Sequence, residues 1–180
     1  MNEDLFFWFN SWAGVSPGFD GLWLFLARGL GWFLVIVLLG YLLVRRAAGR
    51  GLLLITAAPI TAWLIGQILK KVFASPRPFL VLDHVTVLWQ HGSYDAFPSG
   101  HAVFFAALAT ALYFFNRRWG GVYFLGALLI GLARVVIGIH WPFDVVAGWL
   151  IGFGLTLGLY FLINFWSRKK LFDISDYPMR

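Results

Sequence analysis

The chain has 180 residues, of which 61% are hydrophobic and 12% charged, with a formal net charge of +6 and a mean hydropathy of +0.79. The charged fraction is about half of the roughly 25% found in soluble domains, which excludes an ordinary water-soluble protein. The sequence contains no cysteine, which excludes disulfides, thiol nucleophiles and cysteine-ligated metal sites.

The N-terminal segment 1–16 is predicted to be interfacial. It begins MNEDL, which is acidic where a targeting peptide would be basic. The apolar side chains of DLFFWFNSW favour a helix that lies in the membrane surface. Arg28 falls inside the next apolar run, and we interpret it as a side chain extending toward the outer interface in preference to a site residue.

Sustained apolar runs approach the roughly 20 residues that cross a hydrocarbon core. They cover residues 21–44, 51–69, 101–115, 121–139 and 145–166. The chain has neither an internal repeat nor a low-complexity linker. The sequence therefore predicts one membrane-embedded domain over residues 1–180, an all-α polytopic bundle of about five to six transmembrane helices.

Basic residues gather in alternate connections of this bundle. They are Arg45, Arg46 and Arg50 after the first run, Arg117 and Arg118 after the third, and Arg168, Lys169 and Lys170 after the last. The positive-inside rule makes this face cytoplasmic, together with the tail 167–180. In a membrane protein the arrangement of the charges matters more than their sum, so we expect no nucleic-acid partner.

A first polar cluster, LKKVFASPRPFL, is expected on the opposite, outward face of the bundle. Pro76 and Pro78 restrict the backbone around Arg77, so its guanidinium can be aimed. Lys70 could simply anchor the end of a span. However, basic residues on the side that the positive-inside rule disfavours indicate an anionic ligand.

A second cluster on this face is Pro98-Ser99-Gly100-His101. Ser99 suits the N-cap of a helix, and Gly100 allows a close approach to the backbone. The free N–H groups and the positive end of the helix dipole would then favour an anion. Taken alone, the stretch fits a capped helix with an interfacial histidine equally well.

A third cluster contains Arg134, His140 and Asp144. Arg134 is deep in its span, which is costly unless the side chain faces a polar cavity or a partner. Asp144 follows Pro142 in the first turn of the next helix, where it could be a capping acid or could reach back to the His140 ring. A histidine with a carboxylate behind it is a prepared nucleophile or base.

Together the clusters supply three cations, a helix N-terminus with a hydroxyl, two histidines and a carboxylate. Cations and N–H groups match the charge on the equatorial oxygens of a phosphoryl group in transfer. One histidine can attack while the other protonates the leaving oxygen. A non-catalytic lipid-binding or transport protein would need the cations but neither both histidines nor Asp144.

The order and spacing of these motifs resemble the signature of the type 2 phosphatidic acid phosphatases: Lys70-x6-Arg77-Pro78, Pro98-Ser99-Gly100-His101 and Arg134-x5-His140-x3-Asp144. The resemblance implies that His140 forms a phosphohistidine, that Asp144 orients its ring, and that His101 is the general acid. It implies phosphate binding by Lys70, Arg77, Arg134, Ser99 and Gly100.

The resemblance also implies that neither a metal nor any other cofactor is needed, and that His140 is neutral while His101 is charged. The family usually has a serine where this chain has Ala133, so one hydrogen bond is expected to be missing there.

Within that family, DLFFWFNSWAG and Arg77-Pro78-Phe79 resemble undecaprenyl-diphosphatases of the bacitracin-resistance type. This implies an outward-facing enzyme of the bacterial inner membrane that converts undecaprenyl diphosphate to undecaprenyl phosphate and phosphate, for peptidoglycan synthesis. Phosphatidylglycerophosphate, phosphatidate and a lipid A phosphate remain alternative substrates. We interpret His84, His91 and Asp95 as solvated loop residues and not as headgroup contacts.

Overall fold

The structure, a computed structural model, describes residues 2–45, 49–90 and 92–166, and this part of the chain contains helices and no strand. The helices in chain order are α1 (Asn2–Asn10), α2 (Pro17–Leu24), the π-helical turn η1 (Phe25–Gly29), α3 (Leu30–Val44), α4 (Gly49–Phe73), α5 (Pro78–Val81), α6 (Gly100–Phe115), α7 (Arg117–Val136) and α8 (Pro142–Trp166). The predicted tail 167–180, Arg46 and His91 lie outside the described residues.

Four helical segments of the described chain are long and apolar enough to cross a membrane. They are Pro17–Val44, Gly51–Val81, Arg117–Val136 and Pro142–Phe165, and α6 is a shorter apolar helix. The predicted all-α, multi-pass membrane protein is therefore confirmed. Each of the predicted apolar runs corresponds to one of these helices.

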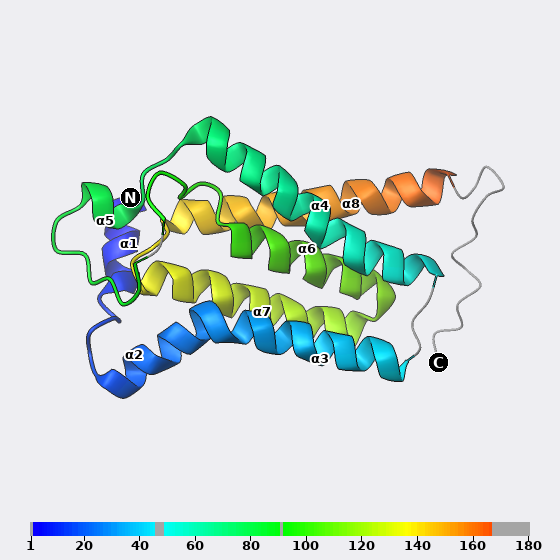
Figure 1. Cartoon of the computed structure of the whole chain (residues 1–180), viewed down its shortest axis with the longest axis horizontal. Helices are drawn as coiled ribbons and strands as arrows, with labels where there is room; N and C mark the ends of the chain where they lie inside the picture. The colour runs from blue at the N-terminus through cyan, green and yellow to red at the C-terminus, as the bar shows by residue number, and fades with distance from the viewer. Residues whose placement is uncertain (1, 46–48, 91, 167–180) are drawn as a thin grey trace.

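The long helices run side by side along the longest axis of the molecule (Figure 1). The short helices α1 and α5 lie at one end, which we call the site end. The C-terminal end of α3, the N-terminal end of α4 and the turn from α6 to α7 lie at the other, which we call the distal end. The motif residues fall at the site end because α4 and α7 finish there and α6 and α8 begin there.

Helix α6 is the centre of the bundle and packs against α4, α7 and α8. It approaches α8 closely because α8 presents glycines: a Cβ at Gly148 would lie 2.8 Å from the Cβ of Ala102 and 2.9 Å from the Ser99 carbonyl oxygen. Small residues at helix contacts let backbones approach in this way. The Ser99 N–H also donates to the Asp144 carbonyl oxygen at 3.0 Å, which joins the second and third motifs.

Helix α1 is fastened to the site end. Phe6 is fully buried, and the Asn10 side chain donates to the carbonyl oxygens of Thr86 and Val136 at 2.8 and 2.9 Å. The Thr86 N–H donates back to the Asn10 amide oxygen at 2.9 Å. The interfacial position of α1 stays a prediction. The structure adds that α1 packs against the C-terminal end of α7.

Candidate active site

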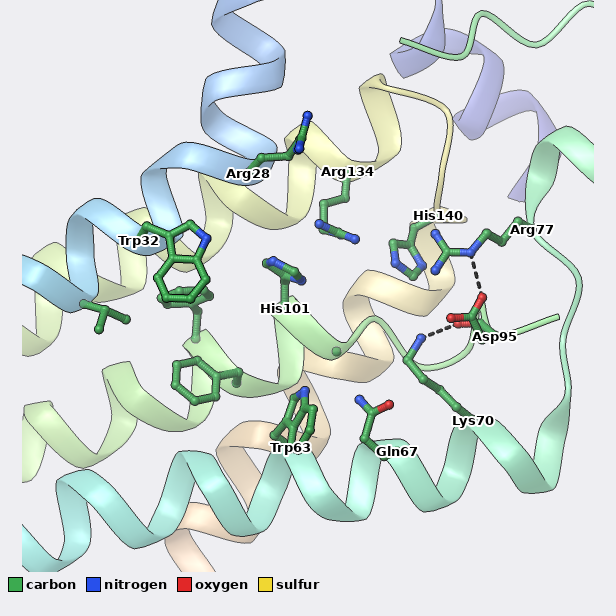
Figure 2. Close-up of a pocket in the computed structure, with 15 residues that line it drawn as sticks. Arg28, Trp32, Trp63, Gln67, Lys70, Arg77, Asp95, His101, Arg134 and His140 are labelled. Atoms are coloured by element: carbon green, nitrogen blue, oxygen red, sulfur yellow. Dashed lines mark hydrogen bonds and ion pairs between the residues drawn. The ribbon is translucent and has the colours of Figure 1, made fainter. Parts of the chain in front are cut away.

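A cavity of about 530 Å³ opens at the site end. The predicted site residues that line it are Lys70, Arg77, Gly100, His101, Arg134 and His140. Figure 2 shows the charged side chains and both histidines converging from different segments of the chain. Trp32, Trp63, Phe104 and Phe105 form an apolar wall. The cavity thus combines cations with an apolar surface, and its size is typical of small-molecule sites.

Arg77 is held from two sides at the start of α5. The residue is only 1% exposed, and its backbone is extended, with φ −75° and ψ 155°, as expected before a proline. Its Nη1 donates to the Ile139 carbonyl oxygen at 3.0 Å, and its Nε donates to Asp95 Oδ1 at 2.9 Å. The first motif is thereby tied to the backbone beside His140.

Asp95 belongs to this cluster, so its interpretation as a solvated loop residue was wrong. It lines the cavity, and its backbone carbonyl oxygen accepts a hydrogen bond from Lys70 Nζ. The loop folds back because Arg77 N–H donates to the Ser93 carbonyl at 3.1 Å and Ala96 N–H donates to the Ser75 carbonyl at 3.0 Å. A sequence signal was available, since Asp95 is an acid that lies between the cationic first motif and the second motif. His84 is an exposed loop residue, as expected.

The Asp95 carboxylate carries a stable negative charge. Burial raises its pKa, but the hydrogen bond and charge of Arg77, followed by the charge of Lys70, outweigh burial and lower the pKa of Asp95 to about 2. The side chain also accepts the Ser93 N–H at 3.0 Å. One anion therefore partly neutralises the cations of the cavity.

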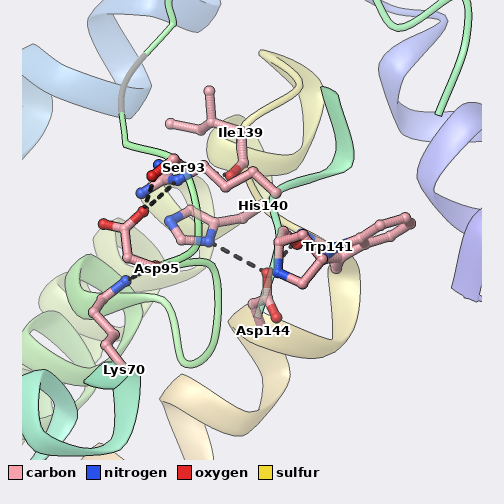
Figure 3. A network of polar contacts seen from close by, with 9 residues as sticks. Lys70, Ser93, Asp95, Ile139, His140, Trp141 and Asp144 are labelled. Carbon is pink, nitrogen blue, oxygen red and sulfur yellow. Dashed lines mark hydrogen bonds and ion pairs between the residues drawn. The ribbon is translucent and has the colours of Figure 1, made fainter. Parts of the chain in front are cut away.

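His140 is buried, and its ring nitrogen Nδ1 faces the carboxylate of Asp144 (Figure 3). The distance from Nδ1 to Asp144 Oδ2 is 3.4 Å, and that oxygen also accepts the Trp141 N–H at 2.9 Å. Because Nδ1 faces Asp144, Nε2 is the nitrogen available to a substrate. Asp144 does not line the cavity but stands behind the ring.

Electrostatics keep His140 neutral. Burial, followed by the charges of Arg134, Arg77 and Lys70, lowers the pKa of His140 well below its usual value of 6.5. These effects oppose the carboxylate that would otherwise favour the imidazolium. A neutral imidazole has the lone pair that a nucleophile requires.

Arg134 is 3% exposed and lies against the π turn. Its Nη1 donates to the Ala27 carbonyl oxygen at 3.2 Å, while its buried Nε has no hydrogen-bond partner within the described residues. Ala133 is fully buried in an apolar cluster and supplies packing but no side-chain oxygen. Arg28 also lines the cavity. The residue is also exposed, so the expected extension toward the outer interface stays a prediction.

The start of α6 differs from the expectation in one detail. Ser99 occupies the N-cap position, but its side chain makes no capping hydrogen bond, and its buried Oγ has no partner among the described residues. Gly100 leaves room at the cavity wall, since a Cβ there would lie 3.4 Å from Gln67 Nε2 and 3.7 Å from Lys70 Cε. Ser99 Oγ and Arg134 Nε are thus buried polar atoms without a partner among the described residues, and of the two residues Arg134 lines the cavity whereas Ser99 does not.

No group of three histidine, aspartate or glutamate side chains in the described part of the chain could hold a metal ion. The polar atoms that face the cavity are mostly cationic donors, which suit an anion.

Comparisons with known proteins agree with this chemistry. Residues 30–168 match the model of the PAP2 superfamily. The bacitracin transport permease protein BcrC of Bacillus licheniformis is 28% identical over 95% of this chain and 82% of its own length. The undecaprenyl-diphosphatase of Sulfolobus acidocaldarius is 34% identical over 74% of this chain and 65% of its own length. The crystal structure of Aquifex aeolicus LpxE superposes with a TM-score of 0.67 and 27% identity, covering 87% of this chain and 92% of that chain.

Proposed function

Because the chain belongs to the PAP2 superfamily, whose relatives include lipid phosphatases, we propose that it hydrolyses undecaprenyl diphosphate to undecaprenyl phosphate and phosphate. The observation that carries the proposal is a buried, neutral His140 facing a cavity that four cations line, Arg28, Lys70, Arg77 and Arg134. The superfamily match supports a membrane-bound lipid phosphatase, and the substrate and the covalent intermediate are the proposed part.

In the proposed reaction, His140 Nε2 attacks the terminal phosphorus and the bond to the bridging oxygen breaks. His101 donates its proton to that oxygen, and undecaprenyl phosphate leaves. Water then attacks the phosphohistidine, gives a proton to His101 and releases phosphate, which restores His140. Asp144 keeps the ring oriented through Nδ1.

The charge on the transferred phosphoryl group is met by groups already in place. Lys70, Arg77 and Arg134 surround the cavity, and we assign them to the equatorial oxygens. The Gly100 N–H and the Ser99 hydroxyl would complete this set. These donors come with the fold and do not depend on a metal ion, so we propose metal-independent catalysis.

The apolar wall supports a lipid substrate. Trp32, Trp63 and Phe104 line the same cavity as the cations, which would let an isoprenoid chain remain among the helices. The relative from Sulfolobus acidocaldarius is named for the same diphosphate.

The proposed location is the bacterial inner membrane, with the site facing outward and the C-terminus in the cytoplasm. Arg45, Arg117 and Arg118 are exposed at the distal end, where the positive-inside rule favours the cytoplasm. Labelling of single cysteines introduced at either end of the bundle in intact cells tests this orientation.

Phosphate release from detergent-purified protein tests the activity. The panel contains undecaprenyl diphosphate, phosphatidylglycerophosphate, phosphatidate and lipid A, each with and without a chelator. We expect undecaprenyl diphosphate to have the highest kcat/KM, chelator to have no effect, and His140→Ala to lower kcat by at least about 10³-fold, because the nucleophile is lost. A 32P-labelled, acid-labile protein adduct should form in the wild type and not in the variant.

A second candidate is transport or binding of a lipid phosphate without turnover. It is favoured by the name of the Bacillus licheniformis relative, a transport permease. Saturable lipid binding with no phosphate release from any member of the panel would support this candidate and contradict the phosphatase.

A further inference from the structure

The segment that carries Arg28 departs from regular helix. In η1 the Leu30 N–H donates to the Phe25 carbonyl oxygen, an i to i+5 bond, between α2 and α3. Single π turns inside helices occur often at functional sites. Here the turn presents the Ala27 carbonyl oxygen to Arg134 Nη1 at 3.2 Å. The π turn is therefore in contact with the cation cluster.

The Arg28 side chain is held beside the same cavity. Its guanidinium carbon lies 4.2 Å from the centroid of the Trp89 ring, which is cation–π distance. An arginine stacked on a ring face keeps its in-plane N–H donors available, so it can still bind an oxyanion bidentately. Arg28 lines the cavity together with His140, although Arg28 comes from η1 and His140 from the connection between α7 and α8.

Arg28 stands apart from the other cations. Figure 2 shows Arg134 between Arg28 and His140, and the bond from Arg134 to Ala27 places its guanidinium next to the residue that precedes Arg28. Lys70 and Arg77 lie on the other side, joined through Asp95. The cavity thus has one cation group around the nucleophile and one further cation beyond Arg134.

We propose that Arg28 forms a second phosphate subsite that binds the phosphate not transferred to His140, and that it thereby selects diphosphate esters over monophosphate esters. The proposal rests on the proposed phosphatase function. When a diphosphate is cleaved, negative charge moves onto a phosphate monoester, which a guanidinium can bind. When a monophosphate ester is cleaved, the leaving group is a single alcohol oxygen that needs only a proton from His101.

Kinetics on two substrates with one lipid chain test the subsite. Farnesyl diphosphate and farnesyl phosphate are compared with wild type, Arg28→Ala, Arg28→Lys and Arg45→Ala. Arg45 is the matched control, because its guanidinium also stacks on an aromatic ring, 5.9 Å from the Tyr41 centroid, but at the distal end. Thermal unfolding in detergent verifies that each variant is folded.

We expect Arg28→Ala to lower kcat/KM for farnesyl diphosphate by about 10- to 100-fold, the range for a lost charge-assisted hydrogen bond. Hydrolysis of farnesyl phosphate should change by less than about 3-fold, within the effect of an exposed charge. Arg28→Lys should retain part of the preference for farnesyl diphosphate over farnesyl phosphate, and Arg45→Ala should match the wild type on both substrates. An equal loss on both substrates, or no loss on either, overturns the subsite.

A binding measurement separates this proposal from the proposed function. In a His140→Ala background without turnover, inorganic pyrophosphate, phosphate and farnesyl diphosphate are titrated with and without Arg28→Ala. A weaker affinity for both diphosphates shows recognition of the diphosphate itself, and a loss for the farnesyl ester alone shows a subsite for lipid-borne diphosphate. Unchanged affinities overturn the proposal. If the wild type hydrolyses neither ester, the proposed phosphatase function is contradicted. The binding measurement still tests whether Arg28 binds the diphosphate.

Discussion

The two ends of the bundle use arginine in opposite ways. At the site end, Arg77 and Arg134 are 1% and 3% exposed and donate to backbone carbonyls of Ile139 and Ala27. At the distal end, Arg45 and Arg117 are exposed. A buried cation aimed by the fold can serve an anion, whereas an exposed cation far from the cavity costs little and contributes mainly to orientation in the membrane.

The connections at each end explain the difference. At the site end the loop of residues 93–96 folds back onto residues 75–77 and covers Arg77. At the distal end, Asn116 closes the turn between α6 and α7 by accepting the N–H groups of Arg118 and Trp119 at 3.0 and 3.2 Å. The guanidinium carbon of Arg117 lies 6.0 Å from the centroid of the Tyr113 ring, and Arg117 remains exposed.

Removing one arginine from each end is the most direct test of this difference between the two ends. Arg134→Ala should lower kcat for undecaprenyl diphosphate by about 10²- to 10³-fold, the cost of losing one donor to a transferring oxyanion. Arg117→Ala should leave kcat within about 2-fold, since surface charges contribute little. Phosphate release at saturating substrate measures both. Similar losses in the two variants would contradict a special role for the buried arginine.

Glycines in the left-handed region offer a matched pair. Gly92 has φ +74°, and a Cβ there would clash most closely with Asp95 Oδ1 and also with its partner Arg77, 2.7 Å from Nε and 2.8 Å from Nη2, whereas Gly49 has φ +70° and open space around it. Both alanine variants should lose about 1 kcal/mol of stability from backbone strain. Only Gly92→Ala should also lower kcat/KM, by about 10-fold, because Arg77 is displaced from its donor geometry.

Thermal unfolding and phosphate release, measured on the same preparations, check the glycine pair. Equal activity of Gly92→Ala and Gly49→Ala would contradict the prediction, because it would show that catalysis does not depend on the position of Arg77.

The smallest expected effect is a pH dependence of stability through His140. Burial and the charges of Arg134 and Arg77 lower the pKa of this imidazole below 6.5, so as pH falls below 6.5 the unfolded chain takes up a proton that the folded protein does not. This group's contribution is therefore constant above pH 6.5 and declines below it, by at most about 1.4 kcal/mol per pH unit.

His140→Gln should flatten that decline. Thermal unfolding at pH 7.5, 6.5 and 5.5 measures it, with Arg117→Ala as the distal control that should follow the wild type. An identical acid decline in wild type and His140→Gln would mean that His140 is not kept neutral by its surroundings.

Much of the site was predictable because its residues lie in short, ordered motifs. Lys70, Arg77, His101, Arg134 and His140 were proposed from spacing, and the structure brings all of them to one cavity. Ser99 was expected to cap α6 through its side chain, and it does not, since its Oγ is buried without a partner among the described residues. Local propensity cannot report which way a side chain turns in a crowded helix contact.

The all-α membrane class, the order of the apolar helices and the motif residues can be predicted from the sequence, because hydrophobic length and motif spacing are local properties. The pairing of Asp95 with Arg77 and the place of Arg28 at the cavity are visible in the folded structure alone. These roles depend on contacts between distant segments. Arg77 meets Ile139 across 62 positions and Arg134 meets Ala27 across 107, distances along the chain that no local pattern encodes.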